Sequence, residues 1–239
     1  MVVSTKAIVI SSLKYAESDL IVTCYTEVAG LKTYILRRIA SSKKGKLRVA
    51  QFQPLTQLDL IAFHKNKGGL EQIREAKVIL PYQTLHTNII KSSLTLFISE
   101  VLKNAIHEES NDLFLYRYLS ESLNWLDAND DIANFYILFL LNLTTHLGFY
   151  PDHSTIEHSY FNMLEGNFQK NETNKYCKKG NFINHFKLFF GINFDTLKQI
   201  KMQKKERLDL LNLLLDYYQL HLHGFKKPKS VLILNQLFS

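Results

Sequence analysis

The sequence predicts an α+β protein in which a small antiparallel β-barrel precedes an all-helical domain. Two observations predict this order. Over residues 1–80 the apolar residues gather in short β-favouring runs, and from residue 84 onward they recur every three to five positions, as on a helix. The 239 residues are 46% hydrophobic and 21% charged, which is typical of a globular chain with a core and excludes wholesale disorder.

Five strands are expected in the first 80 residues, at Lys6–Ile10, Asp19–Tyr25, Leu31–Leu36, Leu55–Phe63 and Ile73–Leu80. Glu27–Gly30 predicts a hairpin turn after the second strand, and Asn66–Gly69 predicts one after the fourth. Five strands in so short a segment leave no room for a helical crossover. We therefore expect residues 1–80 to form a five-stranded antiparallel OB-fold barrel, a common nucleic-acid-binding fold.

The all-helical domain is expected over residues 81–239, with four to six helices. The apolar spacing predicts helices at Leu85–Ala105, Leu113–Leu126, Ile132–Leu147, Glu206–His223 and Ser230–Phe238. Asp112 and Asp131 are the expected N-caps of the second and third helices. The third helix is apolar nearly all round and should lie at the centre of the domain. Residues 152–185 show little pattern, so we expect an irregular connection there.

The charge is unevenly distributed. Of the formal net charge of +7, residues 1–80 carry +7, residues 81–165 carry −8 and residues 166–239 carry +8. This division favours separate surfaces with separate partners, the alternative being solvated surface charge with no partner.

The chain is expected to be soluble and cytoplasmic. Its longest uninterrupted apolar stretch is Phe135–Leu141, far below the roughly 20 residues that span a bilayer. No signal peptide is evident at the N-terminus, and no membrane partner is expected. Cys24 and Cys177 are too few for a disulfide framework and indicate a reducing compartment.

A basic segment, residues 37–48, lies between the third and fourth expected strands and contains no acid. Lysine and arginine bind a phosphate backbone mainly through charge, so this segment predicts binding of a nucleic acid. The cations expected to contact phosphate are Arg37, Arg38, Lys43, Lys44, Lys46 and Arg48, with Lys32, Lys65 and Lys67 as weaker candidates. Stacking of bases on Tyr25, Tyr34, Phe52 or Phe63 is an alternative to the barrel-core role that their strand spacing favours.

No enzyme or metal signature is present. The Gly-Lys of residues 45–46 has no glycine five residues earlier, and neither a Gly-x-Ser-x-Gly elbow nor a His-Glu-x-x-His motif occurs. His153, His158 and Cys177 are spaced too irregularly to predict a metal site. We expect a non-enzymatic protein with no catalytic residues, no cofactor and no bound metal.

Several segments in order resemble the bacterial recombination mediator family RecO. They are Thr5–Ile10, Tyr15–Val22, Tyr25–Glu27, Gly30–Leu31, the basic segment, Gln53–Leu55, Leu147–Pro151 and Glu165–Phe168. The resemblance extends to about residue 170. It implies a DNA-binding OB-fold, a helical domain, annealing of complementary strands, and help in loading recombinase onto DNA coated with single-strand-binding protein. It also implies RecR as a partner, both single- and double-stranded DNA as ligands, and a location at the nucleoid.

One feature departs from that family. Many members carry a four-cysteine zinc module after the Leu-Gly-x-x-Pro landmark, and counting from Pro151 places its ligands near Ile156, Ser159, Lys170 and Thr173. None of these residues is a thiolate ligand, so we expect a degenerate, zinc-free insert at about residues 152–185.

The resemblance also implies docking of the C-terminal tail of single-strand-binding protein, which is acidic and ends in an aromatic residue. A receptor for it needs an apolar pocket with cations at its rim. The cations expected to bind this partner are Lys198, Lys201, Lys204, Lys205 and Arg207, unless they are only a solvated approach to a helix. Two other functions stay open, a protein–protein adaptor with basic docking surfaces and an RNA-binding OB protein.

Overall fold

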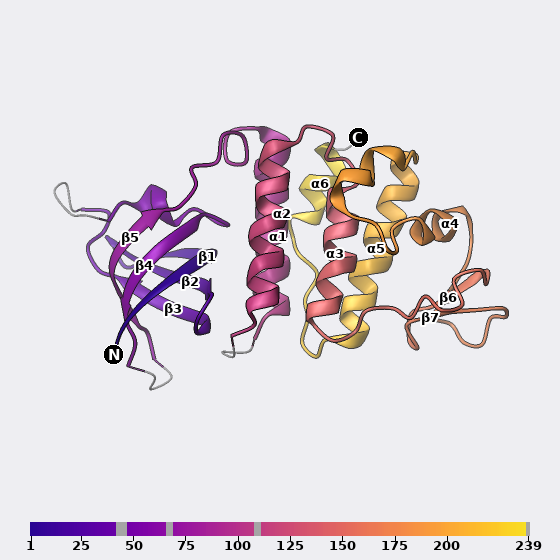
Figure 1. Ribbon diagram of the computed structural model, residues 1–239, viewed down its shortest axis with the longest axis horizontal. Coiled ribbons are helices and arrows are strands. Elements are labelled where there is room, and N and C mark those ends of the chain that lie inside the picture. The colour runs from indigo at the N-terminus through magenta and orange to yellow at the C-terminus, as the bar shows by residue number, and fades with distance from the viewer. Residues whose placement is uncertain (42–46, 66–68, 108–110, 238–239) are drawn as a thin grey trace. The chain divides into compact units, whose positions relative to one another are not determined.

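The computed structural model describes residues 1–41, 47–65, 69–107 and 111–237, without the side chains of Asn235 and Leu237. The chain forms two compact units, Met1–Asp127 and Ala128–Ser239 (Figure 1). The first unit contains two helices beyond the expected domain boundary at residue 80, and that boundary stays a prediction. None of the described helices is long and apolar enough to cross a membrane.

The first unit begins with a five-stranded antiparallel sheet in the order β3-β2-β1-β4-β5. Its strands are β1 (Val2–Tyr15), β2 (Asp19–Thr26), β3 (Gly30–Leu36), β4 (Gln57–Phe63) and β5 (Gln72–Val78). The sheet is not closed by a continuous ladder, because β3 and β5 do not pair, and Tyr34 of β3 forms an isolated parallel bridge with Glu71, the residue just before β5. The predicted five-stranded antiparallel sheet is confirmed and is consistent with an OB-fold.

The sheet is curved around an apolar core. Val9, Val22, Cys24 and Leu58 are fully buried in this core, because alternate side chains of each strand point to the same face. The register of β1 against β2 shifts between Val9 and Ser11. This bulge changes which side chains of β1 face the core on either side of it.

Two helices, α1 (Ile89–Ala105) and α2 (Leu113–Ala128), complete the first unit. The Ser99 hydroxyl of α1 donates a hydrogen bond to the Ile10 carbonyl of β1 at 2.6 Å. The predicted cap of α2 is confirmed, since the Asp112 carboxylate accepts the backbone N–H groups of Phe114 and Leu115. The Ser99 hydrogen bond therefore fixes α1 to the sheet, and the Asp112 cap fixes the start of α2.

The second unit is built around α3 (Phe135–His146), which is buried over most of its surface as its composition predicts. Its predicted N-cap, Asp131, is wrong, because the helix begins three residues later, after Asn134. The Asn134 side chain does not cap the helix but donates to the Ile200 carbonyl and accepts from Arg207. The remaining elements are α4 (Asn181–Lys187), η2 (Phe194–Gln199), α5 (Lys204–His221) and α6 (Val231–Leu237).

The expectation of an irregular connection over residues 152–185 is wrong. The segment contains a three-stranded antiparallel sheet in the order β7-β6-β8 and the start of α4. The strands are β6 (Tyr160–Asn162), β7 (Asn167–Gln169) and β8 (Cys177–Lys178). Strands of two or three residues are too short to show a period of two in the sequence.

Candidate nucleic-acid interface

The turn after β3 presents two exposed cations, Arg37 and Arg38. Arg38 has a φ of 56°, a left-handed conformation that is uncommon outside glycine. Its backbone N–H donates to the Asp19 carboxylate at 2.7 Å, and the Ala40 N–H donates to the Ser18 carbonyl at 3.1 Å. These two bonds join the start of the basic segment to the β1–β2 turn and fix the backbone that carries both guanidinium groups.

The far end of the basic segment is also anchored. Leu47 packs against the core of the sheet, and the Arg48 N–H donates to the Gln51 side chain at 2.7 Å. Gln51 in turn donates to the Ala76 carbonyl of β5 at 3.0 Å. The Arg48 side chain is exposed. Lys43, Lys44 and Lys46, which are expected to contact phosphate, lie outside the described residues.

The weaker candidates lie in a different setting. Lys32 is half-buried and lines a cavity of about 370 Å³ together with Glu71 and His107. Lys65 has an exposed side chain, and its backbone N–H donates to the Glu71 carboxylate at 2.7 Å. The buried Glu71 carboxylate adds negative charge beside both lysines, which makes this region less favourable for phosphate. Lys67 lies outside the described residues.

A buried polar pair lies close to Glu71. The Tyr34 hydroxyl is 2.9 Å from Nε2 of His64, and burial raises the pKa of Tyr34. Burial lowers the pKa of His64, so its imidazole is mostly neutral at pH 7. The pair therefore joins β3 to the residue that follows β4 and adds no positive charge to the surface.

The four aromatic candidates differ in exposure, and three of them have the buried position that the strand spacing favours. Tyr25, Tyr34 and Phe52 are buried, whereas Phe63 is 43% exposed. Tyr15 is a further exposed aromatic residue that the predicted strand Lys6–Ile10 does not include, because β1 continues five residues beyond Ile10. The alternation of Leu13 and Tyr15 with polar residues before the turn was the signal that this strand is longer.

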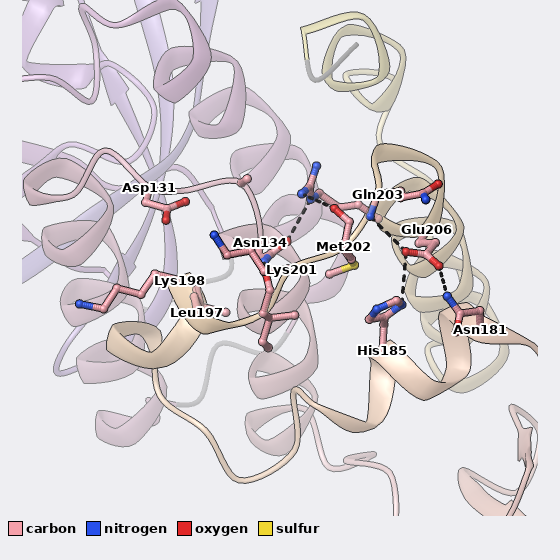
Figure 2. Close-up of a pocket in the computed structure, with 13 residues that line it drawn as sticks. Asp131, Asn134, Asn181, His185, Leu197, Lys198, Lys201, Met202, Gln203 and Glu206 are labelled. Carbon is pink, nitrogen blue, oxygen red and sulfur yellow. Dashed lines mark hydrogen bonds and ion pairs between the residues drawn. The ribbon is translucent and has the colours of Figure 1, made fainter.

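The second unit contains a cavity of about 520 Å³ (Figure 2). Its apolar lining includes Leu197, Ile200 and Met202, and exposed Lys198 and Lys201 also line it. Four of its other lining residues form a polar group that joins α4 to the start of α5. There the Glu206 carboxylate contacts the side chains of Asn181 and His185 and accepts the Gln203 backbone N–H, which lowers the pKa of Glu206.

The cations expected to bind a partner differ in their surroundings. Lys198 and Lys201 line the cavity, and Lys204 and Lys205 lie in the first turn of α5. Arg207 is half-buried, and its guanidinium donates to Asn134 at 3.0 Å and to the Met202 carbonyl at 3.3 Å. Arg207 thus stabilises the cavity wall, and Lys198 and Lys201 are better placed to meet a ligand.

The residues at the expected zinc positions do not fit the metal. Ile156, Ser159, Lys170 and Thr173 supply no thiolate or imidazole, and the described residues contain no group of three His, Cys, Asp or Glu side chains that could hold a metal ion. The Thr173 hydroxyl instead donates to Gln169 at 2.8 Å and contacts the Asn162 amide at 3.3 Å. Asn162 is fully buried, and its side-chain oxygen accepts the backbone N–H groups of Leu164 and Glu165.

We expect the purified protein to hold no stoichiometric zinc, because amide and hydroxyl groups occupy this small sheet where a zinc module needs thiolates. Elemental analysis of the protein after exhaustive dialysis checks this prediction. One zinc per chain would contradict it and would direct attention to His153, His158 and Cys177.

Comparison with known families identifies the chain. Residues 1–82 match the family model described as Recombination protein O N terminal, and residues 86–230 match Recombination protein O C terminal. The chain belongs to the RecO family. It is 48% identical to a relative in Christiangramia forsetii and 46% identical to one in Flavobacterium johnsoniae, and each comparison covers 100% of both chains. Both relatives are named DNA repair protein RecO, and the family resemblance seen in the sequence is confirmed.

Proposed function

We propose that this RecO family protein is a non-enzymatic DNA-binding mediator of recombinational repair. It binds and anneals DNA strands and helps to load recombinase onto single strands coated with single-strand-binding protein, together with RecR. The observation that carries the proposal is the anchored basic turn on the first unit, where Asp19 fixes the backbone of Arg38 beside exposed Arg37. Lysine and arginine side chains on such a turn neutralise phosphates without reading base sequence.

The proposal predicts salt-sensitive binding without sequence preference. If about five phosphates are neutralised, log Kobs on single-stranded DNA falls with log salt at a slope of about −3.5. Replacing Arg37 and Arg38 together by glutamine removes two of these contacts, so the slope is expected to flatten by about 1.4. A gel-shift or anisotropy titration across a salt series measures both slopes.

The matched control is the double substitution of Arg74 and Lys77 by glutamine. Both side chains are exposed on β5 and their removal changes the net charge by the same amount. This control is expected to leave the slope nearly unchanged. Equal slopes for the two double variants would show that binding follows net charge and not the turn after β3. No binding of either DNA form by the unmodified protein would favour the adaptor function instead.

The second unit supports a second part of the proposal, docking of the C-terminal tail of single-strand-binding protein in the 520 Å³ cavity. Leu197, Ile200 and Met202 offer apolar surface for the terminal ring of such a tail, and Lys198 and Lys201 offer charge for its carboxylates. The carboxylates of Asp131 and Glu206 also line the cavity and oppose an acidic ligand. Binding therefore depends on the two lysines.

Reversing the charge of Lys198 and Lys201 to glutamate is expected to weaken binding of an acidic, aromatic-ended tail peptide at least tenfold, because each substitution replaces attraction by repulsion. Titration of a labelled peptide against the full chain measures the effect. The same reversal at Lys170 and Lys229, two exposed lysines that do not line the cavity, is the control. Unchanged peptide affinity in the first variant would place the tail elsewhere.

A further inference from the structure

The outer face of β1, β2 and β3 is the face that points away from the buried core of the sheet. Its end nearest the β1–β2 turn is apolar and exposed. In an antiparallel pair, directly opposite residues share a face of the sheet. Leu13 is opposite Ile21, which is opposite Ile35, so these three side chains form one row across three strands. Tyr15 is opposite Asp19 in the next row toward the turn. The Thr23 and Thr33 hydroxyls, 3.2 Å apart, mark the row on the other side.

The helices do not cover the rows that contain Leu13 and Tyr15. On the same outer face, Ile8 and Tyr25 are buried, and the Tyr25 hydroxyl bonds to the Asp112 carbonyl at the start of α2. Leu13 is 65% exposed and Tyr15 is 52% exposed. Within the part of the chain that the structure describes, the Tyr15 side chain makes no hydrogen bond or ring contact. The phenol ring is therefore available to a ligand.

Positive charge lies at the edge of this apolar end. Arg37 and Arg38 are exposed and follow directly after β3, whose Ile35 belongs to the apolar row. The turn also carries two acids, Glu17 and Asp19, and the Asp19 carboxylate accepts the Arg38 backbone N–H. An apolar and aromatic surface bordered by two cations is complementary to a ligand that combines flat apolar rings with a chain of negative charges.

An unpaired nucleic-acid strand is such a ligand. Its bases have free faces that stack on aromatic rings, whereas the bases of a duplex are stacked on one another and present only their edges in the grooves. Phosphate contacts at Arg37 and Arg38 serve both forms of DNA equally. The aromatic and apolar surface therefore adds affinity for the single strand alone.

We propose that Tyr15, with Leu13, forms a stacking platform for unpaired bases and gives this protein a preference for single-stranded over double-stranded DNA. The inference rests on the proposed DNA-binding function and adds the form of DNA that the site selects. Arg37 and Arg38 hold the strand by its phosphates, and Tyr15 holds it by its bases.

The test compares the full-length protein with Tyr15→Ala, Tyr15→Phe and Leu13→Asn variants. Anisotropy titrations at one salt concentration use a labelled thymidine 20-mer and a labelled 20-base-pair duplex. Tyr15→Ala is expected to weaken binding of the single strand about tenfold and to leave duplex binding unchanged, since one stacking contact is lost. Tyr15→Phe keeps the ring and is expected to bind as the unmodified protein does, and Leu13→Asn is expected to show a smaller loss on the single strand alone.

Phe63→Ala tests the competing stacking candidate, because Phe63 is an exposed aromatic residue on β4, which is separated from β2 and β3 by β1. It is expected to change neither affinity. An equal effect of Tyr15→Ala on both forms of DNA, or no effect on either, overturns the stacking platform while the proposed function stands. Failure of the unmodified protein to bind any DNA overturns both, and a loss in Phe63→Ala equal to that in Tyr15→Ala overturns the assignment to this face.

Discussion

Replacing Asp127 with alanine is expected to lower the free energy of unfolding by about 3 kcal/mol, because a carboxylate with several hydrogen bonds is removed. The Asp127 carboxylate accepts the backbone N–H groups of Gln83, Thr84 and Leu85 at 2.8 to 3.0 Å. The buried Lys91 ammonium donates to the Asp127 carbonyl and to the Thr84 hydroxyl, so the same cluster also holds a charge away from water. Urea denaturation followed by circular dichroism measures the loss.

The pH dependence of the free energy of unfolding separates the contribution of the Asp127 charge from that of the side chain's shape. Burial raises the pKa of Asp127, but the hydrogen bonds from Gln83, Thr84 and Leu85 outweigh it, and the pKa lies below its usual value. A depressed pKa contributes stability above the unfolded-state value of about 3.9, and this contribution is lost as the pH falls through the folded-state value. The stability gap between the unmodified protein and Asp127→Asn should therefore narrow below about pH 4.

Glu121→Ala provides the control for Asp127, because Glu121 is an exposed carboxylate on the same helix. Its removal is expected to change the free energy of unfolding by less than about 0.5 kcal/mol. A loss in Asp127→Ala no larger than this would mean that the backbone of residues 83–85 finds other partners and that the Asp127 carboxylate does not stabilise this segment.

The sequence predicts elements well where the pattern is long enough to show a period. The alternating faces of β2 and the apolar surface of α3 are both confirmed. The sequence pattern predicts the wrong helix boundary where tertiary contacts determine that boundary. Asp131 has the chemistry of an N-cap, but the helix begins after Asn134, whose amide bonds to Ile200 and Arg207, residues distant in the sequence.

The candidate site also combines features that the sequence predicts with features that depend on tertiary contacts. The charge of the basic segment is visible in the sequence, and the exposure of Arg37 and Arg38 agrees with it. The fixing of the Arg38 backbone by Asp19 depends on the register of two strands, and Arg207 differs from its neighbouring lysines only through its contacts with Asn134 and Met202. Neither feature has a signal in local composition.

The small sheet of the second unit raises a physical question, because strands this short are seldom stable without a metal or a disulfide. Phe161 and Phe168 are opposite each other on β6 and β7, and both are buried. Phe161 lies 5.2 Å from Phe186 of α4 and 5.7 Å from Tyr217 of α5, measured between ring centroids. The aromatic cluster joins the sheet to two helices. Its buried apolar surface stabilises the sheet, as bound zinc does in a zinc module.

Replacing Phe161 with alanine is therefore expected to lower the free energy of unfolding by about 4 kcal/mol, through lost burial and the cavity left between the two helices and the sheet. Leu164→Ala, at an exposed position just after β6, is the control and should cost less than about 0.5 kcal/mol. Urea denaturation with and without a chelator measures both variants. A loss in Phe161→Ala below about 1 kcal/mol, or a large destabilisation of the unmodified protein by the chelator, would show that a bound metal and not the aromatic cluster stabilises this sheet.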